Sequence, residues 1–365
     1  MTSSVKGPRA AAALLAVCAS TGGGCTTTPT EAPAHSRVAE RASGTDAAER
    51  RTVVAASLLT DEITEVRLTR EPWRFAGYEG QIITTPHYRV YTTLDRCRWL
   101  DRLGLFMERG LEHYSTAIVR LPKPRKHLKT YLFSTRNQWE AKTRQLLLSR
   151  APDFLTLGRG GYTTRATSVL YYIGRSDTLS IAAHEGWHQY TQRTFKYPLP
   201  VWLEEGLATY MEGYVSDPYG LPKFRSWANL ERYHTLRDAV GHGRLIPLGE
   251  LFLRRPESFL SSGKNRLLIY YGQVWALTHF LMEGEQGRYR GDLQQLLLEA
   301  AGVRTAASGH LRDRRHRARS RLGPAVVQAY FNHDLGAFET QYLHFVRQIS
   351  RAGGRGRIVE GRRPF

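Results

Sequence analysis

The sequence predicts an α+β fold, in which a small mixed sheet with helices precedes a mostly helical lobe. Two patterns predict this fold. Between about residues 80 and 215, short β-rich runs alternate with amphipathic segments, whereas over 216–350 apolar residues recur at helical spacing. The chain of 365 residues is long enough to bury a large core divided between two such lobes.

The lobe over residues 80–215 opens with strand and helix patterns in alternation. The segment at 87–92 alternates in polarity and is rich in β-formers, which predicts a strand. Over 95–119, apolar side chains recur three and four positions apart, which predicts a helix. Similar patterns predict strands at 128–133 and 168–173, helices at 137–147 and after 177, and a turn at 158–162.

The lobe over residues 216–350 is predicted from helical periodicity alone. The periodic segments are 226–240, 266–283, 290–301 and 325–349. Between the last two, residues 304–321 contain seven arginines and few apolar side chains, and we expect a solvated loop there. The tail at 351–365 is rich in glycine and arginine, and we expect it to be disordered.

The first 25 residues have the pattern of an export signal. Lys6 and Arg9 precede a short apolar run, residues 10–19, that cannot span a membrane as a stable helix. Small residues then lead to Cys25, as at a bacterial lipoprotein cleavage site, so we expect a lipid anchor at Cys25. Cys18 is a second candidate, and ordinary secretion is the alternative. Residues 26–50 contain almost no large apolar side chains, which predicts a flexible tether.

Cysteine content limits the exported part to a fold without disulfides. Once Cys18 is removed with the signal and Cys25 carries lipid, Cys97 alone remains, so no internal disulfide can form. Cys97 falls in the helix predicted at 95–119. We therefore expect a buried packing residue rather than a nucleophile.

The formal net charge of +19 has two explanations. Arginine supplies most of it and the charges are scattered, which favours a general arginine preference without a specific partner. The alternative is attraction to anionic lipid, wall polymer or nucleic acid. Nucleic acid is not expected, because the basic stretch at 304–321 lacks interleaved aromatic residues and a recognisable binding fold.

The most specific feature of the sequence is His-Glu-Gly-Trp-His at residues 184–188. On a helix, His184 and His188 lie on one face, one turn apart, so both imidazoles can face one ion. Nitrogen and oxygen donors in this arrangement suit Zn²⁺. Glu185 follows the first histidine and flanks the ion, where its carboxylate can hold a water molecule.

A catalytic zinc needs a third protein ligand, and Glu205 is the best candidate. Sixteen residues separate it from His188, which allows the first helix to end near Phe195 and a new helix to begin near Pro200. Glu205 would lie in the first turns of that helix. Glu212 shares its face and is either a carboxylate that orients a ligand histidine or a surface residue.

Together with residues 202–208, Trp-Leu-Glu-Glu-Gly-Leu-Ala, the His-Glu-Gly-Trp-His segment resembles the gluzincin metallopeptidases. The second segment is similar to the Trp-Leu-Asn-Glu-Gly-Phe-Ala stretch of the aminopeptidase N group, with Glu204 in place of asparagine. The chain resembles the bacterial peptidase-MA-like domains more closely. These share a Tyr-x-Val-Tyr strand, here at 88–91, and a Tyr-x-x-x-Trp helix, here at 271–275.

This resemblance covers residues 85–350 and implies a zincin-like fold. It also implies that His184, His188 and Glu205 are zinc ligands and that Glu185 is the base. It does not transfer a substrate. A Gly-x-Met-Glu-Asn motif is absent from the sequence, so aminopeptidase activity has no support.

The expected chemistry is amide hydrolysis, with Glu185 moving a proton from water to the leaving amine. The tetrahedral oxyanion needs a further donor. Tyr271 is the first choice for this donor, with Tyr270, His234 and His242 as alternatives, and each can equally be a packing or surface residue. The strand at 168–173 either pairs with an extended substrate as an edge strand or lies inside the sheet.

The sequence therefore predicts a cell-envelope zinc endopeptidase that acts on peptide or protein substrates. The alternative is a non-catalytic, zinc-containing binding module of the envelope that uses its basic surface. Glu185 argues against the alternative, because a binding module has no need of a base beside its metal.

Overall fold

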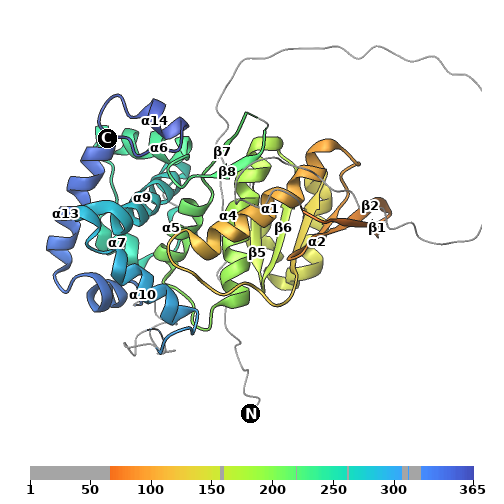
Figure 1. Cartoon of the computed structure of the whole chain (residues 1–365), viewed down its shortest axis with the longest axis horizontal. Helices are drawn as coiled ribbons and strands as arrows, with labels where there is room; N and C mark the ends of the chain where they lie inside the picture. The colour runs from red at the N-terminus through yellow and green to blue at the C-terminus, as the bar shows by residue number, and fades with distance from the viewer. Residues whose placement is uncertain (1–65, 157–159, 219, 261–262, 306–310, 312–321) are drawn as a thin grey trace, which may run out of the picture.

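The computed structural model describes residues 66–156, 160–218, 220–260, 263–305, 311 and 322–365 (Figure 1). The predicted export signal at 1–25 and tether at 26–50 lie outside the described residues, as does most of the stretch at 304–321. Across the described part of the chain, no helix is both long enough and apolar enough to cross a bilayer.

A six-stranded mixed sheet organises one lobe, on the right in Figure 1. Its strands are β1 (Thr69–Phe75), β2 (Tyr78–Thr84), β3 (Tyr88–Thr92), β4 (Leu128–Phe133), β5 (Gly161–Thr164) and β6 (Thr167–Tyr171). Their order is β1-β2-β3-β4-β6-β5, and the two central pairings, β3 with β4 and β4 with β6, are parallel. The fold is therefore mixed α+β, as predicted.

Helices pack on both faces of the sheet and build the second lobe. With the sheet lie α1 (Arg98–Thr116), α2 (Arg136–Leu147), α3 (Ala151–Leu155) and α4 (Arg175–Thr194). Next come α5 (Val201–Met211), a hairpin of β7 (Tyr214–Ser216) and β8 (Pro222–Phe224), and α6 (Leu230–Gly241). The rest are α7 (Leu248–Leu253), α8 (Glu257–Leu260), α9 (Lys264–Glu283), α10 (Arg290–Ala300), α12 (Leu322–Val326), α13 (Leu335–Ile349) and α14 (Arg355–Val359).

Different helices pack on the two faces of the sheet. On one face, Val90 and Leu132 join the main core with α1 and α4. On the other, Tyr131 and Val169 pack with α2, whose Trp139 indole donates to the Val169 carbonyl at 3.0 Å. This alternation follows from the two-residue period of a strand. It fixes α4 against the sheet on the face away from α2.

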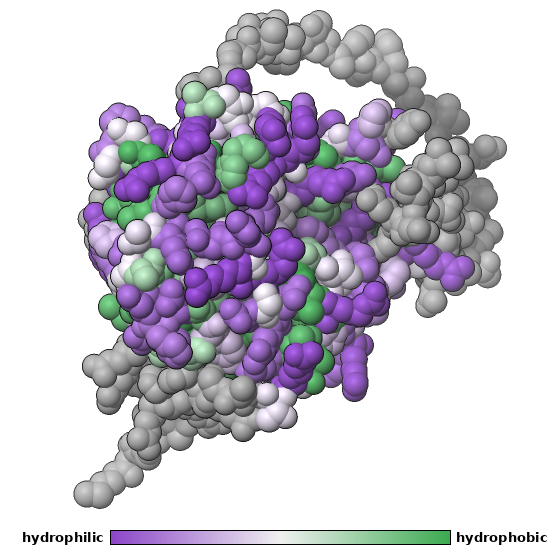
Figure 2. All heavy atoms as spheres, turned by 60° about the vertical axis from the view of Figure 1, so that its left-hand side comes forward, coloured by the Kyte–Doolittle hydropathy of each residue, from purple (hydrophilic) through white to green (hydrophobic). Residues whose placement is uncertain are grey.

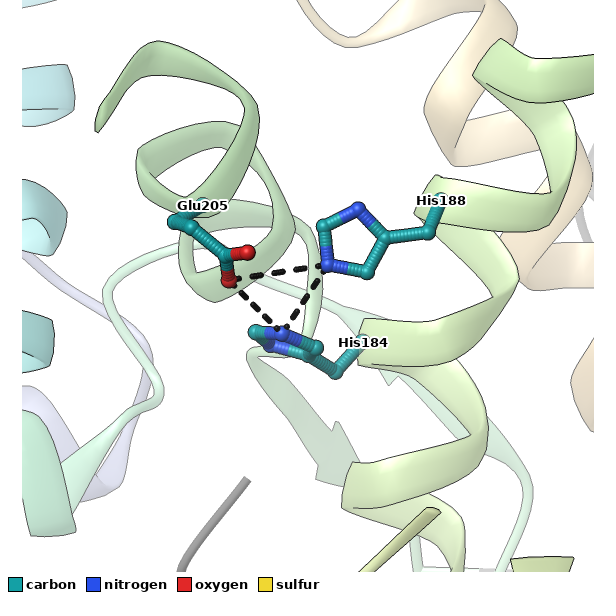
Figure 3. A group of neighbouring side chains, drawn as sticks. All are labelled: His184, His188 and Glu205. Atoms are coloured by element: carbon teal, nitrogen blue, oxygen red, sulfur yellow. Dashed lines mark hydrogen bonds and ion pairs between the residues drawn. The ribbon is translucent and has the colours of Figure 1, made fainter. Parts of the chain in front are cut away.

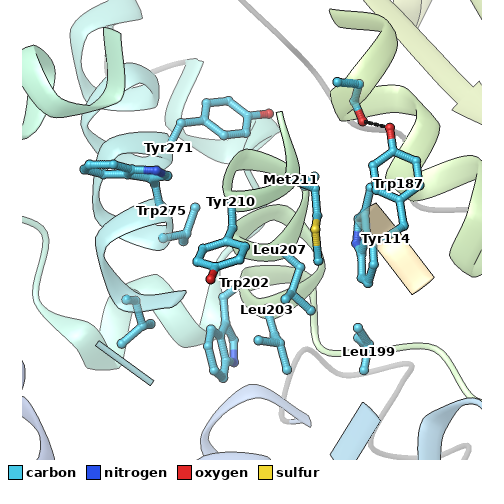
Figure 4. Close-up of a cluster of buried hydrophobic side chains, with 14 of the residues drawn as sticks. Tyr114, Trp187, Leu199, Trp202, Leu203, Leu207, Tyr210, Met211, Tyr271 and Trp275 are labelled. Atoms are coloured by element: carbon cyan, nitrogen blue, oxygen red, sulfur yellow. Dashed lines mark hydrogen bonds between the residues drawn. The ribbon is translucent and has the colours of Figure 1, made fainter. Parts of the chain in front are cut away.

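A close crossing of α1 and α4 depends on Gly186. The Tyr114 hydroxyl on α1 donates to the Ala183 carbonyl on α4 at 2.8 Å (Figure 4). A Cβ atom on Gly186 would lie 2.6 Å from that hydroxyl oxygen. Helix α4 therefore needs glycine at this position to rest on α1.

The long helix α9 forms the centre of the helical lobe, and α5 packs directly on it (Figure 1). A Cβ atom on Gly206 of α5 would lie 2.6 Å from the Thr278 hydroxyl and 2.8 Å from the Val274 carbonyl oxygen, both on α9. Around this crossing, Trp202, Leu207 and Trp275 are almost completely buried (Figure 4). The position of α5 is thus set by contact with α9 as well as with α4.

Replacing Gly206 by alanine is expected to destabilise the fold by about 2 kcal/mol, because the new methyl group meets backbone that cannot turn away. Urea denaturation monitored by circular dichroism would measure the loss. Gly291 of α10 is the matched control, since a Cβ atom there meets nothing within 4 Å. Gly291→Ala should leave stability unchanged or slightly raised. Equal effects of the two substitutions would contradict the close α5–α9 contact.

The sheet begins at Thr69, earlier than the residue 80 predicted from the sequence. Strands β1 and β2 form a hairpin whose two-residue turn, Ala76 and Gly77, has φ values of 50° and 86°. These values are typical of a type I′ turn. Because β1 is an exposed outer strand that contains Pro72, it lacks the regular apolar alternation that marks the buried strands.

The predicted strand at 168–173 is the interior strand β6, so it is not an edge. The edge strand next to β6 is β5, which occupies part of the region predicted as a turn at 158–162; residues 157–159 lie outside the described residues. Gly161 belongs to the strand because the Leu170 side chain occupies the space that its own Cβ would take. The glycine at this position therefore reflects close packing between strands rather than a turn.

Several helix predictions are confirmed, and two C-terminal predictions differ from the structure. The segment predicted as one helix at 325–349 is interrupted at Asp334, whose side chain caps α13. The tail at 351–365, predicted as disordered, contains α14, and its Ile358 is fully buried. One well-placed apolar residue thus anchors a segment whose overall composition is polar.

Cys97 is exposed, in contrast to the prediction of a buried packing residue. It is the residue that precedes α1, with extended backbone angles, and the buried face of the helix begins only at Leu100. The apolar periodicity that predicted the helix therefore starts one turn after the cysteine.

Candidate metal centre

Two consecutive helices build the site, as the sequence predicts. Helix α4 ends at Thr194, and the backbone of the next residue, Phe195, is extended. Pro200 occupies the N-cap position of α5. His184 and His188 project from α4, and Glu205 projects from the second turn of α5 toward them (Figure 3). All three side chains are at most 4% exposed. The structure thus brings together the three residues proposed as ligands.

The three donor atoms form a small triangle. The Nε2 atoms of His184 and His188 are 3.2 Å apart, and Oε2 of Glu205 lies 3.4 and 3.6 Å from them. In a tetrahedral zinc site with ligands at ~2.1 Å, neighbouring ligand atoms are about 3.4 Å apart. The spacing therefore fits one small cation held by all three groups, and these residues could hold a metal ion.

The outer nitrogen of each histidine contacts a carboxylate. Nδ1 of His184 lies 2.9 Å from Glu212, and Nδ1 of His188 lies 3.0 Å from Glu204. A proton on each Nδ1 leaves both Nε2 lone pairs directed at Glu205. Three electron-rich atoms then face one another in a buried space, which is unfavourable unless positive charge lies between them.

The electrostatics of the cluster favour such a charge. Burial opposes ionisation of Glu205, but the His188 and His184 imidazoles outweigh it and lower the pKa of Glu205 to about 2. Burial also opposes protonation of His188, yet the Glu205 and Glu204 carboxylates raise its pKa well above the usual value. A site that holds an ionised carboxylate and attracts protons onto its imidazoles also attracts a divalent cation.

Glu212 is buried against His184, which excludes the surface carboxylate that the sequence left as one alternative. Its side chain is 6% exposed, so it is not a surface carboxylate. Besides His184, it accepts hydrogen bonds from Asn229 at 2.6 Å and from Arg232 at 3.0 Å. The Arg232 guanidinium is itself buried, and it balances the negative charge of this carboxylate. Glu212 is therefore held in place from two sides.

Glu204 is a further carboxylate of this group that the sequence did not predict. Its Oε1 contacts Nδ1 of His188 and also accepts a hydrogen bond from the Thr191 hydroxyl at 2.6 Å. The only signal in the sequence is its place next to Glu205. Adjacent residues on a helix point about 100° apart, which lets Glu205 reach the donor triangle while Glu204 reaches the outer side of the same imidazole.

Replacing Glu204 by glutamine is expected to weaken zinc binding about tenfold, because carboxylates that orient ligand histidines contribute to metal affinity at that level. Competition with a chromogenic chelator would measure the affinity. Glu140, which pairs on α2 with Arg136 and Arg144, provides the matched control. Glu140→Gln should bind zinc as the unaltered protein does, and an unchanged affinity in Glu204→Gln would remove Glu204 from the site.

Glu185 lies beside the donor triangle without being part of it. The side chain is fully buried, and among the described residues neither carboxylate oxygen has a hydrogen-bond partner. Burial raises the pKa of Glu185, and the nearby imidazoles of His188 and His184 oppose this shift. On the other side, the Thr163 hydroxyl of β5 donates to the Glu185 backbone carbonyl at 3.1 Å. The carboxylate is thus buried beside the two imidazoles, where it can accept a proton.

Of the candidate oxyanion donors, the structure places two tyrosines near the site and two histidines away from it. The ring of Tyr271 lies 6.1 Å from that of His184, and the Tyr270 hydroxyl is buried without a hydrogen-bond partner among the described residues. His234 and His242 are exposed on or just after α6, and His242 contacts Asp238. The two histidines therefore cannot serve the buried metal group.

No protein-family model, curated protein or solved structure matches this chain. Any assignment of function therefore depends on the donor triangle, the carboxylates around it and the position of Glu185.

Proposed function

We propose that this protein is a zinc-dependent peptidase of the cell envelope. The observation that carries the proposal is the unpaired, buried carboxylate of Glu185 next to three converging ligand groups. A metal group that served stability alone would have no use for an unpaired carboxylate at its side, and such a group is costly to bury. An exported, lipid-anchored location agrees with the signal pattern that ends at Cys25.

Zinc is the ion that the donor set suits best. Two neutral imidazoles and one carboxylate form a ligand set typical of catalytic zinc, which keeps its fourth position for water or substrate. Calcium and magnesium prefer oxygen ligands only, so two imidazoles disfavour them. When bound, zinc supplies a Lewis acid that lowers the pKa of water and polarises the scissile carbonyl.

The residues of the chain account for the proton transfers. Glu185 accepts a proton from the attacking water and delivers it to the nitrogen of the breaking amide bond. Its raised pKa suits this dual role, because a base of intermediate strength can both accept and return a proton. Tyr271 is proposed as the donor to the tetrahedral oxyanion. The Arg232 guanidinium lies 5.2 Å from the centre of its ring and holds the ring in position.

A zincin-like fold is part of the proposal. It is supported by the packing of α4 on the sheet, by the second helix that supplies Glu205, and by the edge position of β5. Strand β5 contacts α4 through Thr163, next to Glu185.

One observation favours a second function, a non-catalytic zinc-containing binding module. The three ligands are almost fully buried in this structure, as in sites whose metal has a structural role. Such a module would use its basic exterior. Polar side chains dominate the face in Figure 2, with hydrophobic residues in small separate spots. The two functions make different predictions for turnover.

A metal analysis combined with a peptide digest tests the proposal. The purified protein is expected to contain about one zinc per chain and to cleave a peptide library. A chelator should stop cleavage, and added zinc should restore it. Zinc without cleavage of any peptide would favour the binding module, whereas a chain that binds no divalent metal would overturn both functions.

A further inference from the structure

Two polar groups near the metal centre have no use in the mechanism. Oε2 of Glu257, on the short helix α8, is buried and has no hydrogen-bond partner among the described residues. The Tyr270 hydroxyl, on α9, is also buried and unpartnered within that part of the chain. A buried polar atom without a partner costs about 1–3 kcal/mol, and more when charged. Both groups therefore need a partner that the described protein does not supply.

Ring contacts link these two groups to the metal ligands. The Tyr270 ring lies 5.5 Å from the Tyr271 ring, which in turn lies 6.1 Å from the ring of His184. Phe259, two residues after Glu257, packs on the Tyr270 ring with centroids 5.1 Å apart. Burial raises the pKa of Glu257, and the Glu205 carboxylate raises it further. Burial likewise raises the pKa of Tyr270, with Glu205 and then Glu257 adding to the shift. Glu257, Tyr270 and Glu205 therefore interact electrostatically around one region.

Few positively charged side chains of the described residues are available to balance the Glu257 carboxylate. Arg255 lowers the pKa of Glu257, but among the described residues no ion pair joins the two. Arg254 pairs with Glu250, and its guanidinium lies over the Phe259 ring. Arg232 is engaged by Glu212. Arg254 and Arg232 are thus engaged by other carboxylates, and among the described residues none donates to Oε2 of Glu257.

We propose that Glu257 and the Tyr270 hydroxyl form a substrate subsite that binds a positively charged amino or guanidinium group close to the scissile bond. An ammonium group has donors and no acceptor, so a carboxylate and a hydroxyl oxygen satisfy it. The inference rests on the proposed peptidase function and adds a substrate class to it. Peptides with a cationic group adjacent to the cleaved bond are the expected substrates.

Matched peptides test the subsite. Internally quenched octapeptides of alanine and glycine would carry one lysine at each position in turn, and a second set would carry norleucine, which has the same chain without the charge. At one position, kcat/KM for the lysine peptide should exceed that for the norleucine peptide by at least about tenfold, as expected for a charge-assisted hydrogen bond. In Glu257→Gln this ratio should fall to about 1.

Two further variants make the result specific. Tyr270→Phe should lower the lysine preference by a smaller factor, because a hydroxyl contributes less than a carboxylate. Glu79→Gln, at the far hairpin where Glu79 pairs with Arg74, is the control and should keep the full preference. Circular dichroism and zinc content would establish that each variant is folded and loaded.

The outcomes separate the inference from the function on which it depends. Acetylation of the peptide N-terminus distinguishes the two sources of the cation: a fall in kcat/KM on acetylation indicates a free α-amino group, and a lysine preference retained on acetylation indicates a side chain. Cleavage with neither effect, or with either effect unchanged in Glu257→Gln, would overturn the subsite and leave the peptidase intact. Absence of cleavage of every peptide by the zinc-loaded protein would overturn both.

Discussion

Replacing Glu185 by glutamine is expected to reduce peptide hydrolysis about a thousandfold while the zinc content stays the same. Glutamine has the same shape as glutamate but cannot accept the proton of the attacking water. It should also leave the metal group intact, because the donor triangle consists of His184, His188 and Glu205. A buried carboxylate with no hydrogen-bond partner among the described residues is replaced by a neutral amide, so stability should be preserved or improved.

The measurement is kcat/KM on a cleaved peptide together with zinc per chain and thermal melting. Glu140→Gln repeats the same chemical change in a surface ion pair on α2 and should retain full activity. Hydrolysis at the normal rate in Glu185→Gln would remove this residue from the mechanism. Loss of zinc along with activity would instead make Glu185 a metal-binding residue.

The sequence predicts the inner part of this site better than its surroundings. His184 and His188 follow from the four-residue spacing of a helix, and Glu205 follows from a loop length that permits a second helix. The partners of the two imidazoles depend on how α5 crosses α4, which no local pattern encodes. For that reason Glu212 was one of two alternatives and Glu204 was missed, although the structure places each against an Nδ1 atom.

In the fold, too, the elements that local sequence patterns do not encode were not predicted. Strands β3, β4 and β6 were predictable because they lie inside the sheet and are rich in buried β-formers. Strands β1 and β5 lie at its two edges, where β1 is exposed and β5 begins with a glycine, so neither shows the pattern of a strand. In the tail, the side chain of Ile358 is fully buried. The average composition of the fifteen tail residues is polar, so it does not reveal this single buried position.

Replacing Glu205 by glutamine should affect the metal itself. Its carboxylate is the one anionic member of the donor triangle, and its pKa of about 2 means that it is ionised at any ordinary pH. Loss of an outer carboxylate weakens metal binding about 10–100-fold, so loss of the charge on a direct ligand should weaken zinc affinity by more than about 100-fold. Hydrolysis should fall in proportion to the zinc that is lost.

Thermal melting with and without zinc distinguishes a metal ligand from a partner in a metal-free ion cluster. At a free zinc concentration of ~1,000 times Kd, binding stabilises the folded state by about 4.1 kcal/mol; an affinity weakened hundredfold leaves about 1.4 kcal/mol. The unaltered protein should therefore show a large zinc-dependent rise in Tm, and Glu205→Gln a small one. If Glu205 served only as an ion-pair partner of the two histidines, the substitution would lower Tm in chelator and leave the zinc-dependent rise unchanged. That result would end the assignment of Glu205 as a ligand, and with it the proposed catalytic metal centre.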